Sequence, residues 1–484
     1  MDTNMHIICS TRSKSLLFPG YSYMVKRLFT LGLLFGLVTS KAQYTKLLDF
    51  SDSANGKYPN GALLSMNGFL YGMTSRGGTS NYGTVFKIQP DGTGYFKLRD
   101  FTSISPTTPS GGSLNGSLVS DGTFLYGMTE YGGISGAGTI FRIQPDGAGY
   151  GTRFHFMSGS GGSIPNGSLI YNSGVLYGMT TGGGSAGGGT VFRLSTNSTW
   201  ITKLYDLPPG STPFGDLVYD STFLYGATLG GGIYNAGIIF KIKPDGTGFT
   251  TLLDLNGTTT GKSVLGSLIY SSPYLYGMTR YGGSSNKGII FRIKTDGTGF
   301  ANLFNFDGNT GENPTGTLAF DGNFLYGTTR LGGIYNAGTL FRINPDGTNF
   351  TDLFDFGATS NDGKFPGSVI LDNACLYGMT NLGGNSGFGT VFQYCLQAVI
   401  GIDSLAHKDD KLLVYPNPIE DKLELKYEQT LIPEVVIVTN TLGQEVYFVN
   451  TPTTEIDFSN FVKGIYFLTV QTKGQKQVFK IVKD

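Results

Sequence analysis

Residues 70–95 read LYGMTSRGGTSNYGTVFKIQPDGTGY and contain six glycines, a single carboxylate, no histidine and no cysteine. Aromatic and branched residues form one run before the Gly pair and one after it, and Pro-Asp-Gly follows the second run. Such runs, bounded by glycine and asparagine, are typical of β-strands. Asp-Gly supplies the positive φ that a hairpin turn needs. The stretch therefore predicts paired strands and tight turns, and it lacks most of the side chains on which catalysis depends.

The same pattern recurs along the chain at intervals of 48 to 55 residues. Seven copies of its Leu-Tyr-Gly triplet begin at Leu70, Leu125, Leu176, Leu224, Leu275, Leu325 and Leu376. In the fifth copy, strand-like runs occupy residues 266–270, 274–279, 288–293 and 300–306. Four antiparallel strands repeated at this interval predict the blades of a β-propeller. Strict apolar–polar alternation is missing, as we expect when neighbouring blades cover both faces of each sheet.

The two ends of the repeat region complement each other. Residues 44–50, YTKLLDF, match the fourth strand of the repeat but precede the first complete copy. The last copy ends at residues 389–395, GTVFQYC, with no fourth strand after it. We therefore predict that the N-terminal strand completes the last blade of a seven-bladed propeller.

The composition excludes several classes of partner and cofactor. Lys+Arg and Asp+Glu balance at 34 each, so the chain has no basic surface that would indicate nucleic acid. Three cysteines and three scattered histidines speak against a zinc site. Residues 307–313, DGNTGEN, lack the spaced carboxylates of a calcium loop. No metal, cofactor or catalytic residue is assigned.

The N-terminus has the features of a secretory signal peptide. Lys26 and Arg27 precede the apolar run 28–38, and a small-x-small site ends at Ala42. Residues 1–42 are thus interpreted as an extension and a signal peptide, with the start at either Met1 or Met24. The propeller is expected over 43–396, followed by a linker over 397–411.

Residues 412–484 predict a small Ig-like β-sandwich, because alternating strands of suitable length are separated by Gly and Pro-Asn turns. Four ordered motifs carry a resemblance to the type IX secretion C-terminal sorting domain. Their residues are Tyr415, Pro416, Asn417 and Pro418, then Gly443, then Gly464 and Tyr466, and finally Lys480 and Lys483. The resemblance implies export through the type IX machinery, cleavage by its sortase-like peptidase, and either release or attachment to surface lipopolysaccharide. The extracellular space or outer cell surface is the implied location.

The repeat itself resembles the GloVer tandem repeat of exported bacterial proteins, through the pattern LYGxTxxGGxxxxGTVF over residues 44 to about 395. It is also loosely similar to kelch blades. The resemblance implies a propeller and brings no catalytic residues.

Positions that differ between the repeats are the candidates for binding. They lie in the loops between the second and third strands, which share one face of a propeller with the connections between blades. The candidates there are Arg76, Glu130, Tyr131, Tyr234, Arg280, Tyr281, Arg330 and Tyr335. Arginine and tyrosine can stack on and hydrogen-bond a glycan or a protein. The alternative is a solvated rim whose tyrosines cover the blade edges.

Asp216 is a further candidate, since small residues occupy the equivalent position in the other six repeats. The function predicted from these features is non-catalytic binding or scaffolding. The rival function is that of a propeller-type polysaccharide lyase or glycoside hydrolase. A glycosidase would need two carboxylates that face each other. Glu130, Glu312 and Asp216 are the acids available for such a pair.

Cys375 and Cys395 are the cysteines that remain after residue 42. Counting from the loop between Thr380 and Gly389 places Cys375 opposite about residue 394, one residue from direct register. A disulfide is compatible with that separation and with an exported chain. Two free cysteines that pack as small apolar residues are the alternative.

Overall fold

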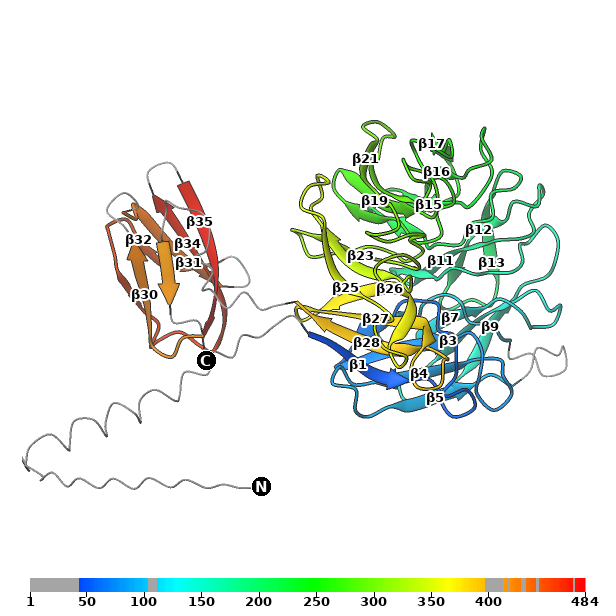
Figure 1. Cartoon of the computed structure of the whole chain (residues 1–484), viewed down its shortest axis with the longest axis horizontal. Helices are drawn as coiled ribbons and strands as arrows, with labels where there is room; N and C mark the ends of the chain where they lie inside the picture. Colours follow the sequence, from blue (N-terminus) through cyan, green and yellow to red (C-terminus); the bar gives the residue numbers. More distant parts are fainter. Residues whose placement is uncertain are drawn as a thin grey trace, which may run out of the picture. The chain divides into compact units, whose positions relative to one another are not determined.

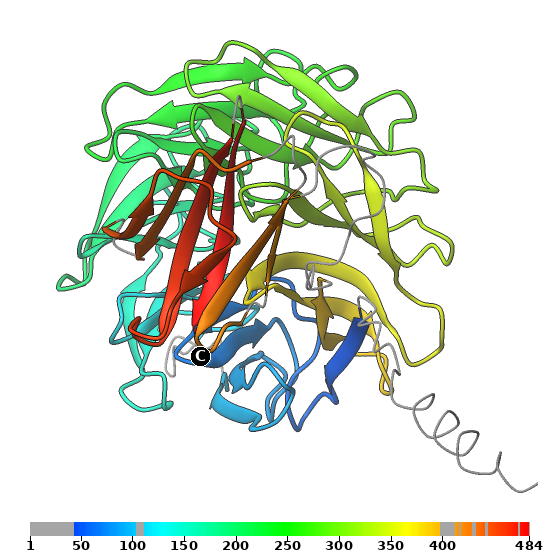
Figure 2. The same ribbon diagram turned by 90° about the vertical axis from the view of Figure 1, so that its left-hand side faces the viewer.

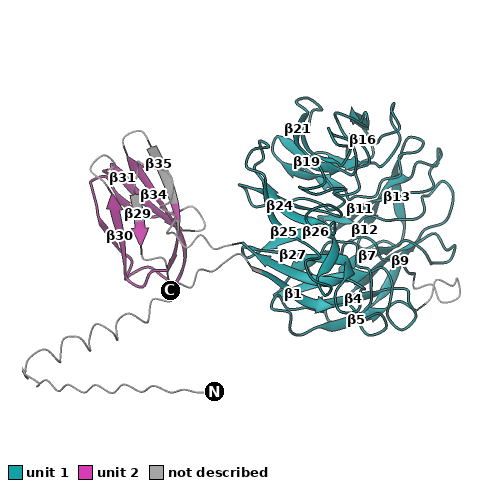
Figure 3. Ribbon diagram, in the orientation of Figure 1, with its two compact units in different colours: residues 1–398 teal, residues 399–484 magenta. Residues whose placement is uncertain are grey.

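The structure is a computed structural model that describes residues 43–102, 111–396, 412–415, 418–427, 432–440, 444–472 and 475–483 (Figure 1). The chain divides into two compact units, residues 1–398 and 399–484 (Figure 3). Every regular element in the described residues is a β-strand, so the predicted all-β class is confirmed. No helix in these residues is long and apolar enough to cross a membrane. The expected signal peptide and the expected linker lie outside the described residues.

The first unit is a β-propeller that contains seven four-stranded antiparallel sheets in its described part. Blades one to three are formed by β2 (Leu64–Met66), β3 (Phe69–Thr74), β4 (Thr84–Ile88) and β5 (Phe96–Asp100); β6 (Val119–Ser120), β7 (Leu125–Thr129), β8 (Thr139–Ile143) and β9 (Gly151–His155); and β10 (Ile170–Asn172), β11 (Val175–Thr180), β12 (Thr190–Ser195) and β13 (Ile201–Asp206). Blades four and five are formed by β14 (Val218–Tyr219), β15 (Leu224–Ala227), β16 (Ile238–Ile242) and β17 (Thr250–Asp254); and β18 (Ile269–Ser271), β19 (Tyr274–Thr279), β20 (Ile289–Lys294) and β21 (Ala301–Asn305). Blades six and seven are formed by β22 (Ala319–Phe320), β23 (Leu325–Thr329), β24 (Thr339–Ile343) and β25 (Thr351–Asp355); and β26 (Gly363–Asp372), β27 (Cys375–Gly383), β28 (Thr390–Cys395) and β1 (Gln43–Asp49).

The N-terminal strand lies where the sequence predicts it. β1 pairs antiparallel with β28, from Gln43 opposite Cys395 to Asp49 opposite Thr390. In Figure 2 the blade colours run from blue through cyan and green to yellow, and the yellow sheet lies beside the blue one. A hydrophobic cluster joins the two ends of the series, because Tyr377 and Val391 of blade seven pack with Leu70 and Phe86 of blade one.

The inner strands are shorter than the sequence suggests. We expected the first strand of the fifth repeat over residues 266–270, but β18 covers Ile269–Ser271 and pairs with β19 only there. Gly266 and Ser267 instead approach Gly316 and Thr317 of the next blade. Contacts between blades near the centre therefore replace pairing within the blade.

The glycine in the middle of each second strand makes room for an aromatic ring. A Cβ atom on Gly72 would lie 2.5 Å from the Cζ atom of Phe86, which is its cross-strand partner. Gly127 and Phe141 form the same pair in blade two. These glycines thus accommodate the ring of the residue opposite them in the sheet.

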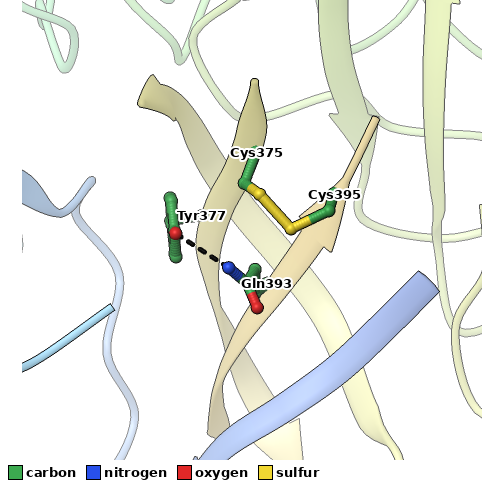
Figure 4. Close-up of a disulfide and its surroundings, with 4 residues drawn as sticks. All are labelled: Cys375, Tyr377, Gln393 and Cys395. Carbon is green, nitrogen blue, oxygen red and sulfur yellow. Dashed lines mark hydrogen bonds between the residues drawn. A yellow bond between two sulfur atoms is a disulfide. The ribbon is translucent and has the colours of Figure 1, made fainter. Parts of the chain in front are cut away.

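Cys375 and Cys395 form a disulfide between β27 and β28 (Figure 4). They are directly opposite in register, with Cα atoms 3.9 Å apart. The expected one-residue offset is therefore wrong. Thr380 pairs with Thr390 rather than with Gly389, and the two threonine hydroxyls are 2.9 Å apart. Two residues along, Gln393 donates a hydrogen bond to the hydroxyl oxygen of Tyr377.

The second unit is a β-sandwich of two sheets. One contains β29 (Leu412–Tyr415), β30 (Lys422–Tyr427) and β33 (Glu455–Asp457), and the other contains β32 (Glu445–Val449), β31 (Val435–Asn440), β34 (Gly464–Thr472) and β35 (Gln475–Lys483). Leu423, Val436, Phe458 and Leu468 are among the buried residues between them.

Several residues of the expected sorting motifs have structural positions in this sandwich. Tyr466 is buried and its hydroxyl donates to the carbonyl oxygen of Val462 at 2.7 Å. Lys483 is buried with its Nζ atom 3.4 Å from Asp421, whereas Tyr415 is exposed. Gly464 begins β34 and Lys480 lies on β35 opposite Phe467. Pro418 is exposed, and Pro416, Asn417 and Gly443 lie outside the described residues.

Candidate functional site

A central cavity of about 430 Å³ lies between the inner strands of the propeller. Each blade has a glycine just before its inner strand (within it in blade seven), and the residue preceding that glycine defines what we call the cavity mouth. Six of these residues line the cavity: Asn60, Asn115, Asn166, Phe214, Leu265 and Thr315. Pro366 is the equivalent residue of blade seven. Asparagine amides hydrogen-bond one another across blades one, two and three, with Asn60 donating to Asn115 at 3.0 Å and Asn115 donating to Asn166 at 2.8 Å. Blades four and five contribute Phe214 and Leu265 instead. The mouth therefore has a polar half and a largely apolar half.

Below the mouth, hydrogen bonds link each of blades one to six to the blade that follows it. The acceptors are Ser117, Ser168, Asp216, Ser267, Thr317 and Ser368, which receive the backbone N–H of the preceding blade at 2.5–2.9 Å. Asp216 is one member of this series, since its Oδ1 atom accepts from the N–H of Ser168. The series explains why small polar residues recur here. Asp216 therefore has a structural role in this series and also lines the cavity.

Replacing Asp216 by serine, the residue found at four equivalent positions, is expected to make stability less dependent on pH. Burial raises the pKa of Asp216, although bonds from Ser168 and Ser267 oppose the shift. Folding therefore favours the protonated carboxyl. The stability that this preference contributes is fully present below the carboxyl pKa of the unfolded chain, about 3.9. It declines as pH rises through the higher pKa of the folded state. The gain in stability from Asp216→Ser, about 1 kcal/mol at pH 7 on the usual scale of single substitutions, should be smaller at pH 3.5.

Urea unfolding at the two pH values measures this difference. Asp245→Ser is the matched control, because bonds from Thr247 lower the pKa of the exposed Asp245 carboxyl and the pH trend should reverse. An equal effect of Asp216→Ser at both pH values would contradict the expectation.

The residue that follows the threonine of each Tyr-Gly-x-Thr segment, in or after the second strand, lies beside the cavity mouth. These residues are Ser75, Glu130, Thr181, Leu229, Arg280, Arg330 and Asn381. In blades one to six, their backbone N–H groups donate to carbonyl oxygens in the segment that leads into the inner strand. Glu130 accepts from the amide of Asn115 at 2.9 Å, and Asn381 donates to Asn60 at 2.7 Å. The position therefore adjoins the mouth, with direct contacts from Glu130 and Asn381, and we call it the mouth-side position.

Arg280 and Arg330 occupy the mouth-side position on the adjacent blades five and six. The guanidinium group of Arg330 lies 5.3 Å from the ring centre of Phe365, and that of Arg280 lies 5.0 Å from the ring centre of Tyr281. Burial and the charge of Arg280 both lower the pKa of Arg330. The two cations thus occupy equivalent positions on neighbouring blades.

The remaining loop candidates lie farther out. Arg76, Tyr131 and Tyr281 follow the mouth-side position and form bridges to the segments between blades. A hydrogen bond with Glu130 raises the pKa of Tyr131, and the charge of Arg76 acts in the opposite direction. Tyr234 and Tyr335 are exposed at separate loop tips of blades four and six. The candidates thus fall into an Arg76–Glu130–Tyr131 group, an Arg280–Tyr281–Arg330 group, and two separate tyrosines.

The acids proposed for a catalytic pair each have a local partner. Glu130 accepts from Ser113 at 2.7 Å as well as from Asn115, and Glu312 forms an ion pair with Lys287. Asp216 belongs to the inter-blade series. In the part of the chain that the structure describes, no group of three or more His, Cys, Asp or Glu side chains could hold a metal ion.

Sequence reasoning missed the cavity mouth. The position is asparagine in the first three repeats (Asn60, Asn115 and Asn166) and a different residue in each of the last four (Phe214, Leu265, Thr315 and Pro366). It therefore varies as much as the loops do. Its variation was the available signal. Its location at the centre depends on how the seven blades pack side by side, which the sequence does not show.

The fold and its sorting motifs define a repeat β-propeller with a C-terminal secretion domain, and comparisons with known families agree. The model of the Gloeobacter/Verrucomicrobia repeat matches residues 114–272 and 213–406, and that of the secretion system C-terminal sorting domain matches residues 413–484. The chain therefore belongs to the Gloeobacter/Verrucomicrobia repeat family. Its sorting domain marks it for type IX secretion, to the cell surface or the extracellular space.

The chain also resembles solved structures at low identity. One is PorZ, an essential bacterial surface component of the type IX secretion system of Porphyromonas gingivalis, at 15% identity and a TM-score of 0.46. The match covers 87% of this chain and 59% of PorZ, less than two thirds of its length. Another is an oligogalacturonate lyase from Vibrio parahaemolyticus, at 9% identity and a TM-score of 0.47, with 75% of this chain and 95% of the lyase covered. No curated protein matches the chain.

Proposed function

We propose that this protein is a non-catalytic binding protein that recognises a glycan or a protein on the face formed by the loops between second and third strands. The support is the contrast between two sets of equivalent positions. The second and third strands repeat a buried threonine pair in most blades, as with Thr74 and Thr84. The mouth-side position instead changes from glutamate to leucine to arginine. Residues that serve the fold repeat, whereas residues that differ around one cavity suit a single asymmetric ligand.

The alternative of a polysaccharide lyase or glycoside hydrolase has less support. A glycosidase requires one acid to protonate the leaving oxygen while a second carboxylate attacks or activates water. Glu312 is held by Lys287, and Asp216 accepts a backbone N–H group. Each acid therefore has a local contact that accounts for it.

Binding is tested with the exported protein, fluorescently labelled, on arrays of glycans and of surface proteins. Tyr131→Ala and Tyr335→Ala are expected to weaken binding tenfold or more, because exposed aromatic rings supply contact area to a ligand. The control is Asp346→Ala in the turn between β24 and β25, on the opposite face. The proposal would be contradicted if Asp346→Ala weakened binding as much as the tyrosine variants do.

We further propose that the type IX machinery and its sortase-like peptidase process the chain, and that surface lipopolysaccharide is one destination. The mature form is expected to begin at Gln43 and to end near residue 411. Mass spectrometry of the exported protein measures both ends. A surface form intact through Asp484 would contradict cleavage.

A further inference from the structure

The loop face carries two arginines at equivalent positions on adjacent blades. Arg280 and Arg330 are half-buried, and neither forms an ion pair with the described residues. The Nε–H group of Arg280 is buried without a hydrogen-bond partner there. Leaving such a donor unpaired is costly, and like charges at equivalent positions on neighbouring blades repel. The pair therefore lacks the compensation that buried charges usually have.

The nearby carboxylate of Glu312 forms an ion pair with a lysine rather than with either arginine. Glu312, which lies between the fourth strand of blade five and the inner strand of blade six, pairs with Lys287. Lys262 adds a cation on blade five, with its Nζ atom 5.4 Å from the ring centre of Tyr281. This side of the mouth is thus positive, and its aromatic rings line the two guanidinium groups.

The opposite side has the reverse character. Glu130 occupies the mouth-side position of blade two, three blades from blade five and three from blade six. Around it lie the amides of Asn60, Asn115 and Asn166. A ligand that spans the mouth therefore meets cations at one end, and amides with one carboxylate at the other.

We propose that the cavity mouth binds an acidic saccharide, with its carboxylate or sulfate between Arg280 and Arg330 and its hydroxyl groups toward the asparagines. This assignment rests on the proposed binding function and specifies its ligand. A guanidinium group presents a planar fork of donors that matches the two oxygens of such an anion. Tyr281 supplies a ring on which a sugar can stack, and Glu130 can accept sugar hydroxyls while repelling a second anion.

The wall below the mouth favours a saccharide over a peptide. An extended peptide is commonly held by main-chain bonds to a free strand edge. Here the N–H groups of Ala62, Ser117 and their equivalents through Thr317 already donate to the next blade. The polar groups at the mouth are side-chain amides and one hydroxyl rather than main-chain groups, and amides that already bond one another can also bond sugar hydroxyls.

The experiment measures binding of the exported protein to four probes by calorimetry at low salt. The probes are a glucuronate trisaccharide, a glucose trisaccharide carrying one sulfate, the neutral glucose trisaccharide, and a triglutamate peptide. At least tenfold tighter binding of one acidic saccharide than of the neutral one is expected, and the two acidic probes separate carboxylate from sulfate recognition. Arg280→Gln and Arg330→Gln should each remove that preference. Arg330→Lys, which keeps the charge but loses the fork, should remove part of it.

Lys243→Gln, an exposed change in the turn between β16 and β17 on the opposite face, is the control and should leave binding unchanged. Thermal unfolding verifies that each variant is folded. Neutral saccharides that bind as tightly as acidic ones, with no effect of the arginine variants, would overturn this inference while leaving the binding function intact. Triglutamate that binds as well as the saccharides would overturn the saccharide assignment. Failure of every probe and of the arrays would overturn both.

Discussion

Deleting residues 43–49 is expected to destroy the cooperative unfolding of the propeller or to lower its midpoint by more than about 10 °C. The deletion removes β1 and leaves β28 as an unpaired edge. It also removes Tyr44, whose ring stacks on Phe354 of blade six with centroids 4.1 Å apart. Since exposed strand edges promote association, the truncated protein should also aggregate.

Differential scanning calorimetry of the full and truncated chains measures the effect. A synthetic peptide of residues 43–50, added in excess, should restore part of the lost stability because it supplies the missing strand. The control is a deletion of residues 412–484, which form a separate unit with their own core. A propeller that unfolds at the same temperature without β1 would show that blade seven does not depend on this strand.

The repeat made the architecture predictable from the sequence, because period, strand pattern and turn chemistry pointed to the same fold. The position of β1 followed from matching residues 44–50 to the other fourth strands. The register of the last hairpin did not follow, since counting residues cannot show that Thr380 pairs with Thr390. A shift of one residue changes which side chains share a face, so such an error decides whether two cysteines are opposed.

The candidate site was predictable only in part, for a related reason. Loop residues such as Arg280 and Arg330 were found because they differ between repeats. Their interaction depends on two adjacent blades, and sequence separation does not show which side chains meet across a boundary. For Asp216, by contrast, the structure shows a structural role that the sequence did not indicate. Its inter-blade hydrogen bond explains why small polar residues occupy this position in other blades.

Gly266→Ala is expected to destabilise the propeller by about 3 kcal/mol or more, at the upper end of the cost of overpacking. A Cβ atom on Gly266 would lie 2.0 Å from the carbonyl oxygen of Gly316. That oxygen belongs to the backbone of the next blade, so no side-chain rotation relieves the clash. Blades five and six would have to separate at the centre, which would also break the 2.9 Å bond from Ser267 N–H to Thr317.

Urea unfolding of three variants tests whether backbone contact at the centre sets this cost. Gly151→Ala is the matched control, because a Cβ atom there meets nothing within 4 Å and its φ is not positive. It should change stability by less than about 0.5 kcal/mol. A Gly266→Ala variant as stable as this control would contradict the argument.

Gly367→Ala should cost less than Gly266→Ala, because its Cβ atom would lie 3.2 Å from the carbonyl oxygen of Asn60. The approach of blade seven to blade one is thus looser than that of blade five to blade six. Ala62 also provides no side-chain acceptor where the other blades have a hydroxyl or carboxylate. The boundary between the first and last repeats is therefore expected to depend less on contacts at the centre and more on the pairing of β1 with β28. Equal costs of the two substitutions would contradict this division.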